Sequence, residues 1–368
     1  MTFKTAILYL LLLPRLLCAM SNQEFCDWWH QYRTTPTIPQ ELKAMEDHFV
    51  DSGLIAYSSN FWNYLNQMNI QQIVSSGFEN FKQTVTRNYF TWVVTSDHLY
   101  AASIYNLVPH LTVTLPNSEM HRVHTLFTPE ESLQFNRMTQ ALLNYMLTQG
   151  AAPLLERLEE PLIGNPPSLL YNGRRISQDI FNSLLEYMPI SRYCPLDQVS
   201  TILEVGAGSG RTAFCFLSLH PGVKYVIVDL PPALYISQKY LSAVFPNKKV
   251  MTFRPFENFE DIAAEYQAAD IVFLMPDQLP MLPNSSVDLF LAIDCLHEMK
   301  PERVAYYLGE AGRLSSHFYF KCWQETVVPF DNVSHTAGSY PIPLHWKPLF
   351  NEPCVVPSTF FHALYQTR

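Results

Sequence analysis

The feature that most constrains this chain is an apolar segment that leads directly into a glycine-rich turn. Residues 202–205 are followed by Gly206, Gly208 and Gly210, three of only 12 glycines in the 368 residues. Glycine adopts backbone conformations that other residues avoid, and it lets the backbone approach a ligand closely. A helical pattern begins at Arg211. The sequence therefore predicts a buried strand, a tight turn and a helix whose first residues lie beside a ligand.

An acidic residue follows the next apolar segment. Residues 225–228 are predicted to form a second strand, and Asp229 comes directly after it. The carboxyl ends of neighbouring parallel strands lie at the same edge of a sheet. A carboxylate there can accept hydrogen bonds from both hydroxyls of a ribose, so we predict a ligand that contains a nucleoside.

The glycine spacing separates two kinds of such ligand. Dinucleotide-binding loops follow G-x-G-x-x-G, which would require a third glycine where this chain has Arg211. Here the spacing is G-x-G-x-G, and Glu204 lies two residues before Gly206. A carboxylate so close to the turn would repel a pyrophosphate, whereas a ligand with an ammonium or sulfonium group would tolerate it.

Residues 204–210 (Glu-Val-Gly-Ala-Gly-Ser-Gly) resemble motif I of the class I S-adenosylmethionine-dependent methyltransferases. Residues 174–186, 225–232 and 288–299 are similar to the sugar O-methyltransferase family, and residues 77–82 and 88–92 are similar to its helical N-terminal portion. The resemblance covers about residues 55–368. It implies S-adenosyl-L-methionine (SAM) as cofactor and an O-methyltransferase whose acceptor is a sugar or glycoconjugate.

The resemblance also implies which residues contact the cofactor. The expected cofactor-binding residues are Glu204, Gly206, Ala207, Gly208, Gly210, Asp229, Leu230, Asp277 and Gln278. For Asp277, a residue that only caps the loop is an equally good interpretation.

The pattern along the chain predicts an α/β fold with a doubly wound, mostly parallel, Rossmann-like sheet, preceded by a mainly helical domain. We divide the chain into an apolar segment (1–20), a helical substrate or cap domain (21–167) and a methyltransferase domain (168–368). The predicted strands are 202–205, 225–228, 250–253, 271–274, 287–293, 318–322 and 360–365. The predicted helices of the last domain are 176–188 (ended by Pro189), 211–219, 233–244, 259–266 and 301–314.

Asp294, His297 and Glu298 are the candidate catalytic residues because they follow the predicted strand 287–293. If the chain turns helical there, the three side chains share one face. An acceptor hydroxyl must lose its proton as it gains the methyl group, and histidine suits that role near neutral pH. Alternatively, His297 and Glu298 only cap and orient the helix. A divalent metal held by these residues, with Asp331 and Asn332, also stays open, although we predict no metal.

Composition limits the remaining choices. The net charge is −9 and no Lys- or Arg-rich stripe occurs, so nucleic acid is not an expected partner. The 7 cysteines form no CxxC pair, which favours reduced, buried thiols.

Residues 1–20 suggest either a secretory signal or a helix that is buried or lies on a membrane; we expect a cytoplasmic protein. The expected partner is a small-molecule or glycan acceptor, and the oligomeric state stays open.

Two other functions remain open at this stage. One is a binding protein that holds SAM without turnover. The other is an NAD(P)-dependent oxidoreductase, which Arg211 at the third-glycine position disfavours.

Overall fold

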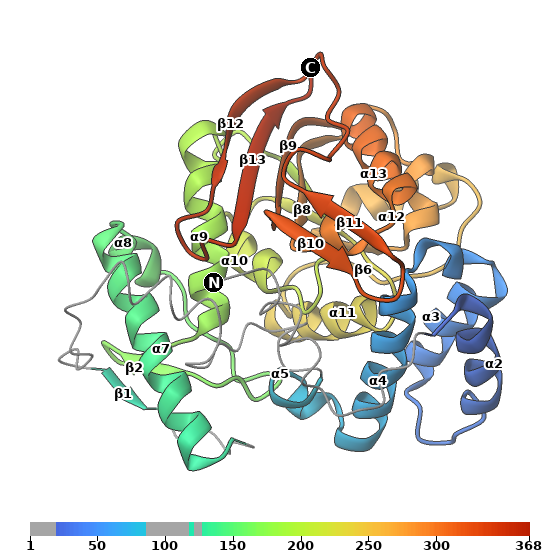
Figure 1. Cartoon of the computed structure of the whole chain (residues 1–368), viewed down its shortest axis with the longest axis horizontal. Coiled ribbons are helices and arrows are strands. Elements are labelled where there is room, and N and C mark those ends of the chain that lie inside the picture. Colours follow the sequence, from blue (N-terminus) through green and yellow to red (C-terminus); the bar gives the residue numbers. More distant parts are fainter. Residues whose placement is uncertain (1–19, 86–117, 121–126) are drawn as a thin grey trace.

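The computed structural model describes residues 20–85, 118–120 and 127–368. Its centre is an 8-stranded sheet in the order β12-β13-β9-β8-β4-β5-β7-β6 (Figure 1). The strands are β4 (Thr201–Val205), β5 (Lys224–Val228), β6 (Val250–Met251), β7 (Ile271–Leu274), β8 (Val287–Ile293), β9 (Ser315–Trp323), β12 (Lys347–Pro353) and β13 (Phe360–Gln366). All neighbours from β6 to β9 are parallel, and β13 is antiparallel to both β9 and β12.

Helices cover both faces of this sheet. Those on one face are α9 (Gln178–Tyr193), α10 (Arg211–Leu219) and α11 (Ala233–Val244); those on the other are α12 (Ala263–Ala268) and α13 (Pro301–Leu314). Successive side chains of a strand point to opposite faces, so Ile227 joins the first core and Val226 the second. This confirms the predicted doubly wound, Rossmann-like fold.

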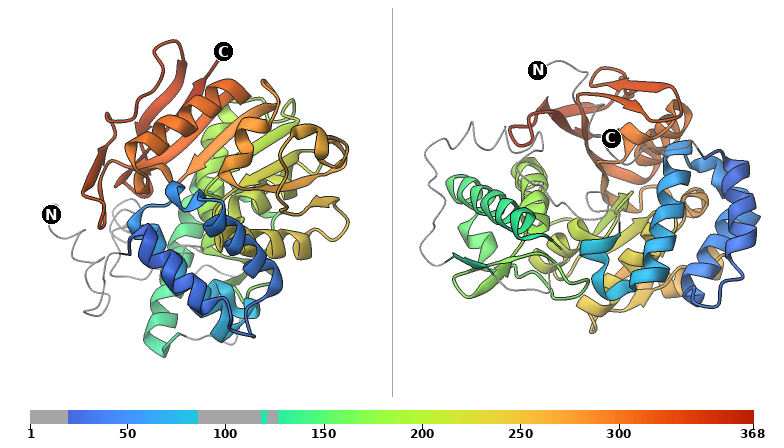
Figure 2. Two further views of the ribbon diagram at one scale, coloured as in Figure 1. Left: turned by 90° about the vertical axis from the view of Figure 1, so that its right-hand side faces the viewer. Right: turned by 60° about the horizontal axis from the view of Figure 1, so that its bottom comes forward.

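Two groups of helices precede α9. Figures 1 and 2 show that α2–α4 and α7–α8 lie on opposite sides of the central portion. One apolar core runs from Phe25 and Leu42 through Met138 to Ile180 and Leu234, so both groups pack against the same face of the sheet. The elements are α2 (Asn22–Tyr32), α3 (Gln40–Asp51), α4 (Asn60–Ser76), α5 (Phe81–Thr84), α7 (Pro129–Thr148) and α8 (Ala152–Leu155).

Short elements complete the described part of the chain. They are the 3₁₀ helices η1 (Leu54–Tyr57), η2 (Phe78–Asn80), η3 (Phe259–Asp261), η4 (Pro276–Met281) and η5 (Leu296–Glu298), the strands β1 (Ser118–Met120), β2 (Leu169–Tyr171) and β3 (Arg174–Ile176), and the hairpin of β10 (Glu325–Val328) and β11 (Val333–Thr336).

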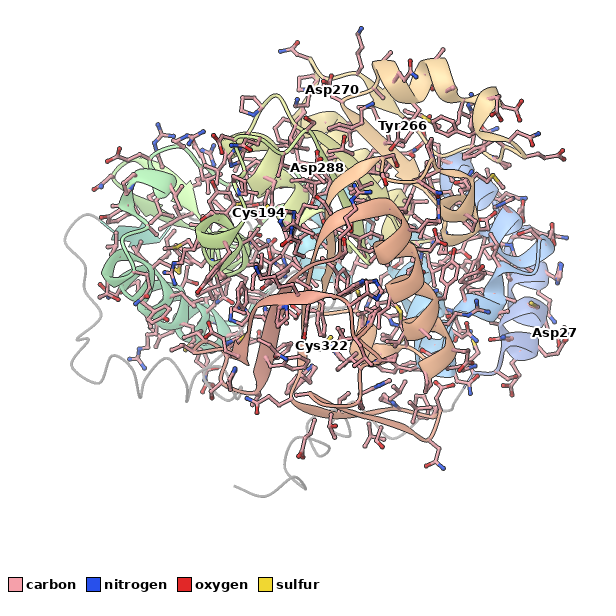
Figure 3. All side chains as sticks on the ribbon, turned by 90° about the horizontal axis from the view of Figure 1, so that it is seen from above. Asp27, Cys194, Tyr266, Asp270, Asp288 and Cys322 are labelled. Atoms are coloured by element: carbon pink, nitrogen blue, oxygen red, sulfur yellow. The ribbon has the colours of Figure 1, made fainter. Side chains whose placement is uncertain are left out.

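Two aspartates, labelled in Figure 3, fasten the amino ends of neighbouring strands. Asp288 Oδ2 accepts hydrogen bonds from the backbone N–H groups of Ser200 and Thr201 at 2.8 and 2.9 Å. Asp270 Oδ2 accepts one from the N–H of Lys249 at 2.7 Å. These bonds fix the strand registers and thereby the positions of the residues at the opposite, carboxyl edge.

The structure corrects four details. The predicted helix 176–188 does not stop at Pro189: α9 continues to Tyr193 with Pro189 inside it. Strand β6 covers only Val250–Met251, and the predicted helix 259–266 is divided between η3 and α12. Strand β12 was not predicted, because its Pro348 and Pro353 are typical of loops. Both are tolerated in an edge strand, where one side of the backbone needs no partner.

Some expectations lie outside the described residues. These concern residues 1–19, including Cys18, and the motif at 88–92. Among the residues that the structure does describe, no helix is long and apolar enough to cross a membrane. Cys26, Cys194, Cys215, Cys295, Cys322 and Cys354 are all free thiols.

Candidate functional site

The glycine-rich turn joins β4 to α10 at the point where the strand order reverses. Gly206, Gly208 and Gly210 have φ values of 70°, 58° and 82°, all in the left-handed region that favours glycine. A Cβ atom at Gly206 would lie 2.6 Å from Cβ of Cys295, so this glycine is also required by close packing against the end of β8. Open α/β sheets bind their ligands in the crevice formed here.

Asp229 holds this turn to the end of β5. Its Oδ2 accepts a hydrogen bond from the N–H of Gly208 at 2.9 Å, and its Oδ1 accepts one from the N–H of Leu230 at 2.7 Å. Burial raises the pKa of Asp229 to about 7, although both bonds act in the opposite direction. Asp229 and Leu230 remain half-buried, while Ala207 is buried in the turn. The structure thus brings together the two features that the sequence linked only by spacing.

Glu204 lies below the turn. Its side chain is buried within β4, and its Oε2 accepts a hydrogen bond from the Tyr225 hydroxyl on β5 at 2.8 Å. Burial raises its pKa to about 7. The contacts place Glu204 between two strands, where it supports the turn from beneath.

The two predicted residues after β7 have different surroundings. Gln278 is buried and bonded to the backbone at both ends, since it accepts from the N–H of Met275 and donates to the carbonyl of Arg254. Asp277 Oδ2 lies 3.5 Å from His48 Nε2, which comes from α3. The His48 ring lies 5.5 Å from that of Phe253. The N-terminal helices therefore reach the carboxyl edge of the sheet.

The residues after β8 do not form the helix that would align them. Asp294 has a φ of 55°, its N–H donates to the carbonyl of Lys321, and only Leu296–Glu298 form a 3₁₀ turn. The chain continues its pairing with β9 for one residue beyond the strand, so the condition for the predicted shared face is not met.

Two of the three candidate catalytic side chains face each other, since His297 Nε2 lies 3.7 Å from Glu298 Oε1. The His297 ring meets the rings of Trp323 and Phe360 edge-on, at centroid distances of 6.4 and 6.1 Å, and those two rings contact each other at 4.6 Å. Burial lowers the pKa of His297 to about 3, so its imidazole is neutral at pH 7. Glu298 accepts a hydrogen bond from Trp62, yet burial raises its pKa to about 8. Burial also raises the pKa of Asp294 to about 6.

Four charged side chains form a group that the sequence pattern did not predict. Glu186 on α9 accepts hydrogen bonds from Arg211 Nη1 at 2.7 Å, Arg211 Nη2 at 2.9 Å and Lys321 Nζ at 2.9 Å. Asp294 Oδ2 lies 3.5 Å from Arg211 and 3.4 Å from Lys321. We call these residues the charge quartet. The only signal in the sequence was a charged residue, Arg211, directly after the glycines.

Several polar atoms near the turn lack a hydrogen-bond partner in the described part of the chain, although they are buried. They are Ser209 Oγ in the turn, Asp277 Oδ1 and His48 Nε2 beside β7, and Asp294 Oδ1 and His297 Nδ1 after β8. Buried polar groups normally have partners, and a polar ligand in the crevice would supply partners to these five atoms. The residues present therefore fit a nucleoside-containing cofactor such as SAM.

The metal alternative gains no support from Asp331, whose carboxylate faces Lys300 and the N–H of Phe61. Across residues 20–85, 118–120 and 127–368, no three His, Cys, Asp or Glu side chains are grouped closely enough to hold a metal ion.

No known family model matches this chain, and no curated protein matches it. Among solved structures it is similar to a SAM-dependent methyltransferase from Aquifex aeolicus, at 14% identity and a TM-score of 0.33, covering 51% of this chain and 93% of that one. It is similar to the pyocyanin biosynthetic protein PhzM, at 13% identity and a TM-score of 0.32, covering 51% and 56%.

A third similar structure is the mitomycin 7-O-methyltransferase MmcR, at 12% identity and a TM-score of 0.33, covering 66% of this chain and 74% of that one.

Proposed function

We propose that this protein transfers a methyl group from SAM to an acceptor hydroxyl. One observation carries the proposal: a turn with three glycines in the left-handed region joins β4 to α10, and Asp229 at the end of β5 binds its central N–H. A turn of this shape lets the backbone contact the ligand, and a carboxylate at the next strand accepts ribose hydroxyls.

The proposed contacts follow the carboxyl edge of the sheet. Gly206–Gly210 hold the amino-acid portion of the cofactor, and Asp229 with Leu230 holds the ribose. Asp277 and His48 each have a buried polar atom without a hydrogen-bond partner. They lie where the adenine of the cofactor would extend from β5 to β7. Glu204 acts indirectly by supporting the turn through Tyr225.

When bound, SAM supplies a methyl group on a sulfonium: the acceptor oxygen bonds to the methyl carbon while the carbon–sulfur bond breaks and its electron pair stays on sulfur. The hydroxyl proton must leave in the same process. We assign it to His297 on its geometry, because its Nδ1 has no hydrogen-bond partner among the described residues and its Nε2 lies 3.7 Å from Glu298 Oε1. Glu298, with a pKa of about 8, and Asp294 complete the proposed site. A base of this kind contributes about 10²–10⁴-fold to the rate.

The cofactor assignment is tested by isothermal titration with SAM and, separately, with NADH. We expect SAM to bind and Asp229→Ala to weaken it, because the ribose loses its acceptor. Tight binding of NADH without SAM would instead assign the protein to the oxidoreductases.

Turnover is tested with methyl-labelled SAM and an acceptor panel that includes sugars, which the motif resemblance favours. We expect His297→Ala to keep the SAM affinity and to lose about 10²–10⁴-fold in turnover. An unchanged rate removes His297 from the mechanism. SAM binding without transfer to any acceptor would indicate the non-catalytic alternative.

A further inference from the structure

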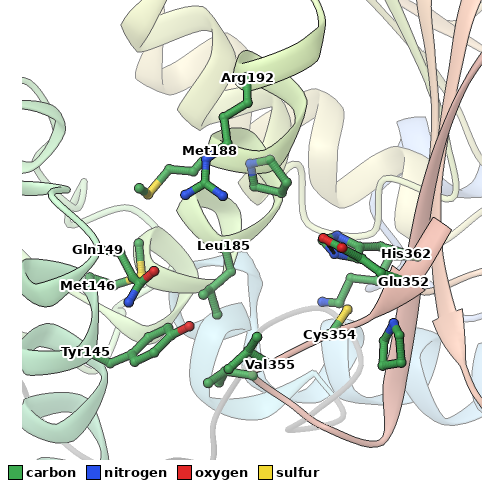
Figure 4. Close-up of a pocket in the computed structure, with 14 residues that line it drawn as sticks. Tyr145, Met146, Gln149, Leu185, Met188, Arg192, Glu352, Cys354, Val355 and His362 are labelled. Carbon is green, nitrogen blue, oxygen red and sulfur yellow. Dashed lines mark ion pairs between the residues drawn. The ribbon is translucent and has the colours of Figure 1, made fainter. Parts of the chain in front are cut away.

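A pocket of about 220 Å³ opens between α7, α9 and the strands β9, β12 and β13 (Figure 4). Drug-sized ligands occupy pockets of about 300–1,000 Å³, so this one suits a smaller molecule. Its apolar lining comprises Met146, Leu185, Met188, Pro189, Pro353, Cys354, Val355 and Val356, and its polar lining comprises Tyr145, Gln149, Arg192, Lys321, Glu352 and His362.

The pocket shares Lys321 with the charge quartet, whose Asp294 directly follows β8. Lys321 lines the pocket, and its Nζ lies 3.4 Å from Asp294 Oδ2. Cys295, which follows Asp294 in the chain, packs directly against Gly206 and donates a hydrogen bond from its thiol to the carbonyl of Val205. A molecule in this pocket would therefore lie beside the end of β8, on the side where the proposed catalytic residues begin.

Pro189 changes the backbone of α9 where this helix lines the pocket. Proline inside a helix removes one backbone hydrogen bond, because it has no N–H to donate to the carbonyl four residues earlier. That carbonyl belongs to Leu185, which lines the pocket together with Pro189. Because α9 continues to Tyr193, Arg192 also reaches the pocket, with its side chain directed from α9 toward the cavity in Figure 4.

The charge of the pocket favours an anion at its mouth. Arg192 is exposed and makes no hydrogen bond or ion pair with any other residue that the structure describes. Glu352, the acidic residue of the lining, has a side chain that is 62% exposed and lies 3.7 Å from His362. Deeper in the pocket, Lys321 is neutralised by Glu186 and Asp294. Arg192 is thus the cation left for a ligand.

We propose that this pocket binds the acceptor, and that the acceptor is a small hydroxylated aromatic acid; the inference rests on the proposed methyl transfer. The carboxylate pairs with the guanidinium of Arg192, which suits planar carboxylates. The ring lies between the side chains of Met146 and Met188, since thioether sulfur contacts aromatic rings favourably. The hydroxyl points toward Lys321 and the end of β8.

The test uses protein saturated with S-adenosylhomocysteine, the demethylated cofactor, and 4-hydroxybenzoate as probe. Phenol lacks the carboxylate and methyl glucoside lacks the ring, so both serve as comparison ligands. The variants are Arg192→Gln, which removes the cation, and Met188→Trp, which fills the pocket. Arg137→Gln is the matched control, because Arg137 is exposed on α7 outside the pocket. SAM affinity and thermal midpoint are measured for every variant.

We expect the wild type to bind 4-hydroxybenzoate at least tenfold more tightly than either comparison ligand. Arg192→Gln should weaken binding of 4-hydroxybenzoate about tenfold or more, because a charge-assisted hydrogen bond is lost. Met188→Trp should abolish binding of this probe. Arg137→Gln should behave like the wild type, and all variants should keep the SAM affinity.

Equal probe binding by the wild type and Arg192→Gln overturns the inference, as does binding of the probe to folded Met188→Trp or preference for methyl glucoside. Failure of the probe to bind also overturns it. Each of these results leaves the proposed function intact when SAM still binds. Absence of SAM binding overturns the proposed function, and the acceptor role of the pocket with it.

Discussion

The charge quartet predicts a large loss of stability when Glu186 is changed. Glu186→Gln keeps the shape of the side chain but removes the negative charge that accepts three hydrogen bonds of 2.7–2.9 Å. Arg211 and Lys321 would then face only Asp294, at 3.5 and 3.4 Å. Breaking a buried ion pair by removing one partner costs about 3–5 kcal/mol, because a buried charge is left uncompensated. We expect a loss in this range for Glu186→Gln.

Urea unfolding followed by circular dichroism measures this loss. With an m-value of about 3 kcal/mol/M, the midpoint should fall by roughly 1 M or more. The control is Glu265→Gln, which breaks the surface pair with Arg254 whose side chains are 46% and 45% exposed; such pairs contribute about 0–1 kcal/mol. Adding Lys321→Met to Glu186→Gln restores the balance of charge and should recover part of the loss.

A midpoint that falls no more in Glu186→Gln than in Glu265→Gln would contradict this prediction. Burial by itself would raise the pKa of Glu186, but Arg211 and Lys321 lower it below the ordinary value. Its contribution is therefore present at neutral pH and is lost as the pH falls through the lowered pKa. In Glu186→Gln this acid-dependent part of the unfolding profile should disappear.

Two further predictions concern the turn. Gly206→Ala should destabilise the fold by about 2 kcal/mol or more and weaken SAM binding, because its Cβ would lie 2.6 Å from Cys295; Gly222→Ala, which meets no atom within 4 Å, is the control for both measurements. SAM affinity should rise between about pH 6 and pH 8, since Asp229, with a pKa of about 7, accepts ribose hydroxyls better when ionised. Titrations should show no such rise in Asp229→Asn, and a flat wild-type profile would contradict the assignment.

The part of the site that the sequence predicted is the part encoded locally. Gly206, Gly208 and Gly210 lie within five positions of one another, and Asp229 ends the next strand, so the rule for parallel sheets places them together. The bond between Asp229 and Gly208 bears out that spatial reasoning.

The rest of the site depends on contacts between distant segments. Glu186 on α9 pairs with Arg211 after β4 and with Lys321 on β9, two strands away from β4, and no local sequence pattern predicts either pair. Pro189 misled the prediction for a related reason: proline ends most helices, and only the packing of α9 against the core shows that this helix continues. His48 reaches Asp277 from a separate group of helices, which periodicity alone does not position.

The geometry makes the proposals separable, because each part of the site can be changed on its own. Gly206 contacts the end of β8 and does not line the pocket, so Gly206→Ala should lower the affinity for SAM before it changes the binding of the acceptor. Arg192 stands at the pocket mouth outside the charge quartet, so its loss should affect the acceptor alone. Lys321 belongs to both the quartet and the pocket lining. A change at Lys321 should therefore weaken binding of the acceptor and also lower the stability of the protein. If the pocket and the charge quartet were independent, only one of these two quantities would change.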